Sequence, residues 1–75
     1  MHNNEVGMQI SKLLAVSSPQ TLGKLKFKLR KMRYGDEIFM SGFDYAIDKG
    51  WIEEFSTEVG ITDRGLEEVG SETSV

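Results

Sequence analysis

Cysteine is absent from this 75-residue chain, and histidine and proline each occur only once. Without a thiol the chain can form neither a disulfide nor a thiolate metal site, and this composition suits a reducing cytosol. The single histidine, His2, lies near the chain end, so we expect no catalysis that uses histidine as a base or nucleophile activator. No apolar run approaches the ~20 residues that span a bilayer. We therefore expect a soluble, cytoplasmic protein.

Other signatures of enzymes are equally scarce. Two pairs of carboxylates share predicted helix faces and could in principle hold a hard cation. They are Asp44 with Asp48, and Asp63 with Glu67. Because no histidine or cysteine accompanies them, solvated acidic faces are the simpler interpretation. The glycines are too dispersed to form a phosphate-binding loop. The sequence thus predicts no enzyme, no cofactor and no metal.

The length of the chain limits it to one small domain. A domain of this size buries only roughly 60% of its unfolded surface. We expect a single domain over residues 1–75, with an ordered core of about residues 5–69. The polar residues 70–75 are predicted to form a disordered tail.

Helical periodicity is clear at the start of the chain. Asn4 can cap a first helix, whose apolar positions recur on one face. Those positions are Val6, Ile10, Leu13 and Leu14. A second helix should begin near Pro19, because serine followed by proline is a common helix entry.

Residues 24–30 admit two interpretations. Basic and apolar side chains alternate strictly there, which is typical of a half-buried strand. Apolar residues also recur at helical spacing, which would place them on one stripe. These are Leu22, Leu25, Leu29 and Met32. The stripe and the preceding Ser18-Pro19 favour a helix, and the strand is the alternative.

A turn at residues 33–36 should lead into a third helix. Asp36 is its predicted cap, and Glu37 lies in the first turn, where negative charge meets the positive end of the helix dipole. The helix should end at Lys49, because Gly50 suits the left-handed conformation that follows many helices.

Two glycines interrupt these predicted helices. Gly7 weakens the first helix by up to ~1 kcal/mol relative to alanine. Gly42 lies in the middle of the third helix. The sequence pattern gives no reason for its position.

Strand-forming residues follow the third helix and predict a hairpin. The first apolar segment contains Trp51, Ile52 and Phe55, and the second contains Val59 and Ile61. Residues 56–58 provide the polar turn between them. Thr62 can cap a following helical turn, and Gly65 would let that turn lie close to the sheet.

This order of segments resembles the winged helix-turn-helix domains over residues 9–65. The matching motifs are Ile10-x-x-Leu13-Leu14, Thr21-Leu22-x-x-Leu25, Phe43-x-x-Ala46-Ile47, Gly50-Trp51-Ile52-Glu53 and Ile61-Thr62-Asp63-Arg64-Gly65. The resemblance implies a mainly α fold with three helices and a small two-stranded β-hairpin, the wing. It also implies a DNA-binding transcriptional regulator whose third helix enters the major groove.

Charge is divided unevenly along the chain. Through Arg33 seven basic residues accompany one acid, whereas from Tyr34 onward eleven acids accompany two basic residues. The predicted third helix carries four acids and one lysine, so DNA phosphates would repel it. An alternative function is therefore a non-enzymatic protein-interaction module, a winged-helix fold whose acidic third helix no longer binds DNA.

The cations concentrate on the predicted second helix, in two rows at i, i+4, i+7 with aromatic residues between them. The candidate nucleic-acid-binding residues are Lys24, Lys26, Lys28, Arg30, Lys31, Arg33 and Tyr34. Together with Phe27 they could brace against or stack on nucleic acid, or bind an acidic protein surface. In the plainer interpretation, Phe27 packs beneath the third helix and the lysines form a solvated face.

Two further expectations concern packing. Four apolar side chains should be buried together, namely Leu25, Leu29, Ile47 and Trp51. The opposite charges of the two halves also predict a weak, salt-sensitive homodimer, because oppositely charged surfaces steer association while apolar residues anchor it. Phe27, Tyr34 and the first helix around Met8 are the candidate anchors.

Overall fold

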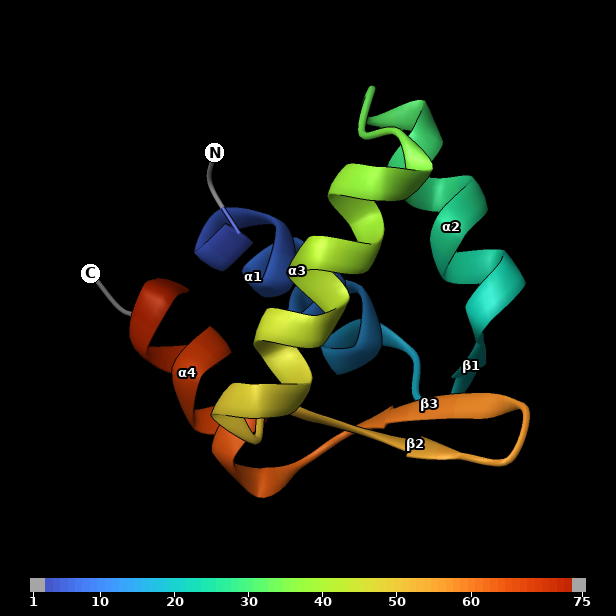
Figure 1. Ribbon diagram of the computed structural model, residues 1–75. Helices are drawn as coiled ribbons and strands as arrows, with labels where there is room; N and C mark the ends of the chain where they lie inside the picture. Colours follow the sequence, from blue (N-terminus) through green and yellow to red (C-terminus); the bar gives the residue numbers. More distant parts are fainter. Residues whose placement is uncertain (1–2, 74–75) are drawn as a thin grey trace.

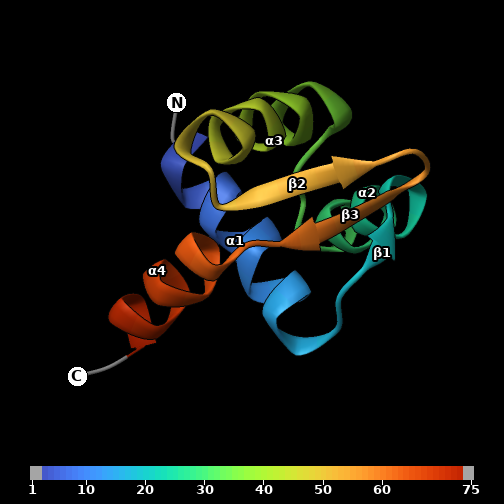
Figure 2. The ribbon, with the colours of Figure 1, turned by 90° about the horizontal axis from the view of Figure 1, so that it is seen from below.

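The computed structural model describes residues 3–73, in which four helices and a small antiparallel sheet form a mainly helical fold (Figure 1). The elements are α1 (Asn3–Val16), β1 (Gln20–Thr21), α2 (Leu22–Lys31), α3 (Asp36–Lys49), β2 (Ile52–Phe55), β3 (Glu58–Ile61) and α4 (Asp63–Thr73). In both ribbon views α1 and α3 lie side by side, with α4 and α2 on opposite sides of them (Figures 1 and 2). The hairpin of β2 and β3 extends beneath α2 in Figure 1.

Within residues 3–73 the sheet has three strands in the order β1-β3-β2, whereas we expected two. The predicted hairpin is confirmed. Ile52 lies opposite Ile61, and Phe55 lies opposite Glu58 next to the turn. Ser56 in that turn has a φ of 40°, the left-handed region that tight hairpin turns require.

The third strand explains why the second helix begins later than predicted. Gln20 and Thr21 pair with β3 instead of entering a helix at Pro19. The helix begins at Leu22, and the Thr21 hydroxyl oxygen accepts a hydrogen bond from the Lys24 N–H at 3.2 Å. A threonine cap of this kind satisfies one of the free donors at a helix start.

Residues 24–30 lie within α2, so the strand alternative is wrong. Leu25 and Leu29 are fully buried, and Leu22 is partly buried. Met32, just beyond the helix, is exposed. The helical spacing of the leucines thus predicted the local structure correctly. The lysines that alternate with apolar residues in the sequence lie on the rest of the helix surface.

The ends of α3 agree only in part with the sequence pattern. Gly35 is its N-cap and makes no side-chain cap bond, whereas the expected cap, Asp36, is the first helical residue. The carboxylate of Asp36 is bound instead by Arg30. At the other end Gly50 has a φ of 77° and closes the helix as predicted.

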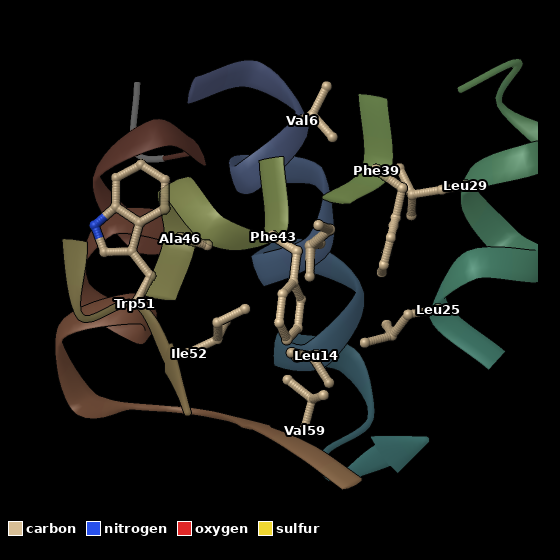
Figure 3. Close-up of a cluster of buried hydrophobic side chains, with 11 residues drawn as sticks. Val6, Leu14, Leu25, Leu29, Phe39, Phe43, Ala46, Trp51, Ile52 and Val59 are labelled. Atoms are coloured by element: carbon tan, nitrogen blue, oxygen red, sulfur yellow. The ribbon is translucent and has the colours of Figure 1, made fainter. Parts of the chain in front are cut away.

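The core gathers side chains from α1, α2, α3 and the hairpin (Figure 3). Its buried members are Val6, Ile10, Leu14, Leu25, Leu29, Phe39, Phe43, Ala46, Trp51, Ile52 and Val59. The rings of Phe39 and Phe43 stack with centroids 5.8 Å apart. Leu25, Leu29 and Trp51 are buried as expected, but Ile47 is 37% exposed. The inward position on that turn belongs to Ala46, because the buried stripe of α3 runs through Phe39, Phe43 and Ala46.

At Gly42 and Gly7, helices α3 and α1 approach each other closely. A Cβ atom built on Gly42 would lie 2.3 Å from Val6 Cγ1 and 2.6 Å from Val6 Cβ. A Cβ on Gly7 would lie 3.1 Å from the Gly42 carbonyl oxygen. The glycines that weaken each helix locally therefore allow the two backbones to approach.

Thr62 joins the hairpin to α4. Its single hydroxyl proton is shared between the carbonyls of Gly50 and Trp51, and its oxygen accepts from the Gly65 N–H at 3.0 Å, which confirms the predicted cap. A Cβ on Gly65 would lie 2.0 Å from the Trp51 carbonyl oxygen, so only glycine fits there. α4 continues through Thr73, well beyond the end expected near Val69. Of the predicted tail, residues 74 and 75 lie outside the described part of the chain.

Candidate nucleic-acid interface

The side of α2 opposite its buried leucines carries Lys24, Phe27 and Lys31, which we call the basic face. Phe27 is 56% exposed, so it does not pack beneath α3. The Lys31 Nζ lies 4.7 Å from the centroid of the Phe27 ring, within the range of a cation–π contact. Within residues 3–73, Lys24 makes no ion pair. The basic face therefore presents an aromatic ring between two exposed cations.

A second group of cations faces α3 and is bound or partly screened there. The Arg30 guanidinium grips Asp36 through two hydrogen bonds, Nε to Oδ1 at 3.1 Å and Nη2 to Oδ2 at 2.9 Å. The hydrogen bond from Arg30 is the main cause that holds the pKa of Asp36 below its ordinary value, and the charge of Lys26 adds to it. These two cations thus offset the start of the acidic helix.

Lys28 contributes to the fold. Its Nζ donates to Gln20 Oε1 at 2.8 Å. The buried Gln20 amide in turn donates to the carbonyls of Leu13 and Ser17, at 3.1 Å and 2.7 Å. Carbonyls at the end of a helix lack partners within it. Lys28 and Gln20 together therefore close the end of α1 against β1.

Arg33 and Tyr34 differ in what they offer to a ligand. Arg33 has a φ of 72°, a conformation that glycine adopts far more readily, and its side chain is exposed. Tyr34 is partly buried and packs against the core. The structure thus separates the two aromatic residues that we expected between the rows of cations, and Phe27 alone of them belongs to the basic face.

The outer surface of α3 is acidic and partly apolar. Its exposed residues include Glu37, Met40, Asp44, Ile47 and Asp48, which we call the acidic face. Met40 and Ile47 are each 37% exposed. We expected Ile47 in the core and did not expect Met40 at the surface. The sequence held one signal of their exposure. Met40 directly follows Phe39, and Ile47 directly follows Ala46, and both preceding residues lie on the buried stripe.

Other features of the described surface offer no clear chemistry. A hollow of about 500 Å³ lies where α1, α3 and α4 meet. Its lining includes Met8, Tyr45, Trp51 and Glu68. Among residues 3–73, no group of three or more histidine, cysteine or carboxylate side chains is placed to hold a metal ion. Within the same range, every helix is too short or too polar to cross a membrane.

Comparison with known proteins adds no family to this description. No family model matches the chain, and neither a curated protein nor a solved structure is significantly similar to it. The basic and acidic faces are therefore interpreted from their own chemistry.

Proposed function

We propose that this protein is a small DNA-binding transcriptional regulator of the winged-helix type, in which α2 supplies the main contacts to DNA. The order α1, β1, α2, α3, β2, β3 supports the winged-helix assignment, because a hairpin directly follows the third helix as a wing does. The observation that carries the proposal is the basic face, where Lys24 and Lys31 flank an exposed ring.

Electrostatics favour α2 over α3 for this contact. Lysine and arginine gain affinity for duplex DNA by neutralising phosphates and releasing counterions. Lys24, Lys31 and the nearby Arg33 are exposed and make no ion pair with other described residues. The carboxylates of α3 would instead be repelled from a groove lined by phosphates. Binding through α2 is thus directed to the DNA backbone, which carries little sequence information.

A pair of charge-matched variants tests the proposal. Lys24→Gln, Lys31→Gln and Arg33→Gln, combined, remove three cations from α2 and its end. Lys12→Gln, Lys49→Gln and Arg64→Gln, combined, remove the three cations that lie elsewhere in the chain. Both triple variants have the same net charge, so only the position of the removed charge differs. Circular dichroism checks that each variant is folded.

Fluorescence anisotropy with random duplex DNA gives the outcome. Wild-type protein should bind at about 50 mM salt and lose affinity steeply as salt rises. The α2 triple variant should bind more weakly, and its salt slope should be shallower by about 0.9 for each phosphate that it no longer neutralises. The control variant should retain most of the binding. Absence of wild-type binding at low salt, or an equal reduction of affinity in both variants, contradicts the proposal.

The second candidate function is a protein-interaction module that does not bind DNA. The observation that favours it is the acidic face, where exposed Met40 and Ile47 lie beside carboxylates. An interface of this kind would bind a basic partner, and the protein would then show no salt-dependent DNA binding in the same titration.

A further inference from the structure

We propose that the basic face of one copy of this chain docks on the acidic face of a second copy, so that the protein self-associates through α2 and α3. The proposal does not rest on DNA binding. It rests on two exposed helix faces of opposite charge, each of which also carries exposed apolar side chains.

The two faces match in spacing. Lys24 and Lys31 are seven residues apart, as are Met40 and Ile47. In an α-helix that separation corresponds to about 10.5 Å along the axis. Phe27 lies between the two lysines, so its ring can be received between Met40 and Ile47.

The charges match in the same arrangement. Asp44 lies between Met40 and Ile47 in the sequence. Asp48 follows Asp44 by four residues, about one helical turn. With the ring of Phe27 seated between the apolar side chains, the flanking lysines can reach these carboxylates. Opposite charges at the rim steer the encounter, while the aromatic residue supplies the anchor that a stable contact needs.

The same pairing chemistry already occurs within one copy. Arg30 of α2 binds Asp36 of α3 through two hydrogen bonds at the shared turn. That contact occupies one edge of each helix and leaves the basic and acidic faces exposed. A second copy is the occupant that supplies both complementary faces at once, because α2 of each copy can contact α3 of the other. In a two-fold dimer every such contact occurs twice.

Charge reversal on each face provides a decisive test. Lys24→Glu with Lys31→Glu makes both faces acidic, and Asp44→Lys with Asp48→Lys makes both basic. Sedimentation velocity should show that wild-type protein associates at about 50 mM salt and dissociates at about 0.5 M salt, where screening is strong. Each variant alone should be monomeric. An equimolar mixture of the two should associate again, because both complementary contacts are restored.

A matched control separates the loss of the acidic face from the change in net charge. Glu67→Lys with Glu68→Lys, on the exposed surface of α4, changes the net charge by the same amount as the α3 variant. Because this control leaves the basic and acidic faces intact, it should associate with itself as wild-type protein does, whereas the α3 variant of equal net charge should be monomeric. Loss of association in the control, or no association in the complementary mixture, would overturn the proposal.

Removal of the anchor tests the apolar part of the contact. Phe27→Ser should weaken association by about tenfold or more, as truncation of a central aromatic residue does at other interfaces. Val16→Ser is the control, because Val16 is 88% exposed at the end of α1 and belongs to neither face. Equal effects of the two substitutions, or a wild-type protein that is monomeric at about 1 mM, would also refute the docking. Because none of these measurements contains DNA, failure of the proposed DNA binding would leave them unchanged.

Discussion

The close crossing of α1 and α3 predicts that Gly42→Ala destabilises the fold although alanine is the better helix former. The new Cβ atom would lie 2.3 Å from Val6 Cγ1 and 2.6 Å from Val6 Cβ. Carbon atoms in contact are normally about 3.5–4.0 Å apart. A rotation of Val6 can move its Cγ1 but not its Cβ, and the Gly7 backbone nitrogen is also only 3.1 Å away. The helices must therefore separate by about 1 Å.

The expected magnitude is the difference of two effects. Overpacking of a core contact costs about 1–3 kcal/mol, while the higher helix propensity of alanine returns up to about 1 kcal/mol. Because the clash involves Val6 Cβ and the Gly7 backbone, the cost should lie in the upper part of this range, about 2–3 kcal/mol, and Gly42→Ala should thus lower the free energy of unfolding by about 1–2 kcal/mol. Gly23→Ala is the matched control, because Gly23 is also helical but no atom lies within 4 Å of its added Cβ.

Urea denaturation followed by circular dichroism measures both variants. Gly23→Ala, in the first turn of α2, should stabilise the protein by up to about 0.5 kcal/mol. The two chemically identical substitutions should therefore change the midpoint in opposite directions. If Gly42→Ala stabilised the fold as much as Gly23→Ala does, the close approach of α1 and α3 would be wrong.

The remaining predictions concern two polar contacts. Arg30 lowers the pKa of Asp36, so their pairing stabilises the fold above the pKa of an unfolded aspartate, about 3.9, and this stabilisation is lost as the pH falls through the lowered pKa. Asp36→Asn should therefore lower the Tm more than Glu37→Gln does near neutral pH, and the difference should vanish in strong acid; a difference that persists in acid would contradict the pairing. Thr62→Val should cost about 1–3 kcal/mol in urea denaturation, because the Gly50 carbonyl and the Gly65 N–H lose their hydrogen-bond partner, whereas the Trp51 carbonyl still accepts from the backbone N–H of residue 62. Thr62→Ser keeps the hydroxyl and should cost less, so equal destabilisation by both substitutions would contradict the role given to the hydroxyl.

Much of the fold could be predicted from the sequence because the local signals agree with the tertiary contacts. The leucine spacing of α2 and the left-handed Gly50 depend on periodicity and backbone freedom, which are visible in the sequence. The hairpin and the Thr62 cap likewise follow from local residue preferences.

Several features that the sequence did not reveal depend on partners in other helices or strands. Gln20 and Thr21 form a strand only because β3 lies beside them. Asp36 was expected to cap its own helix, but Arg30 binds its carboxylate. The position of Gly42 is explained only by Val6 on another helix. Such contacts are set by the assembled fold, and no local pattern encodes them.

For the same reason, the candidate site could be predicted from the sequence only in part. The sequence identified the cations of α2 and the acids of α3, but it could not separate the cations that face α3 from those that face solvent. Arg30 is bound to Asp36, and Lys28 is bound to Gln20. The structure thus divides a uniform basic segment into residues that maintain the fold and residues that remain available to a partner.

The two proposed contacts share residues, and this has a thermodynamic consequence. Lys24 and Lys31 would bind phosphate in one contact and carboxylates of a second copy in the other, so one copy cannot make both at the same basic face. Because linked binding equilibria are reciprocal, self-association should weaken DNA binding by the same factor by which DNA weakens self-association. The acidic face lies outside this competition, since phosphate repels it. Self-association through α2 and α3 would therefore lower the fraction of the proposed DNA-binding surface that is free as the protein concentration rises.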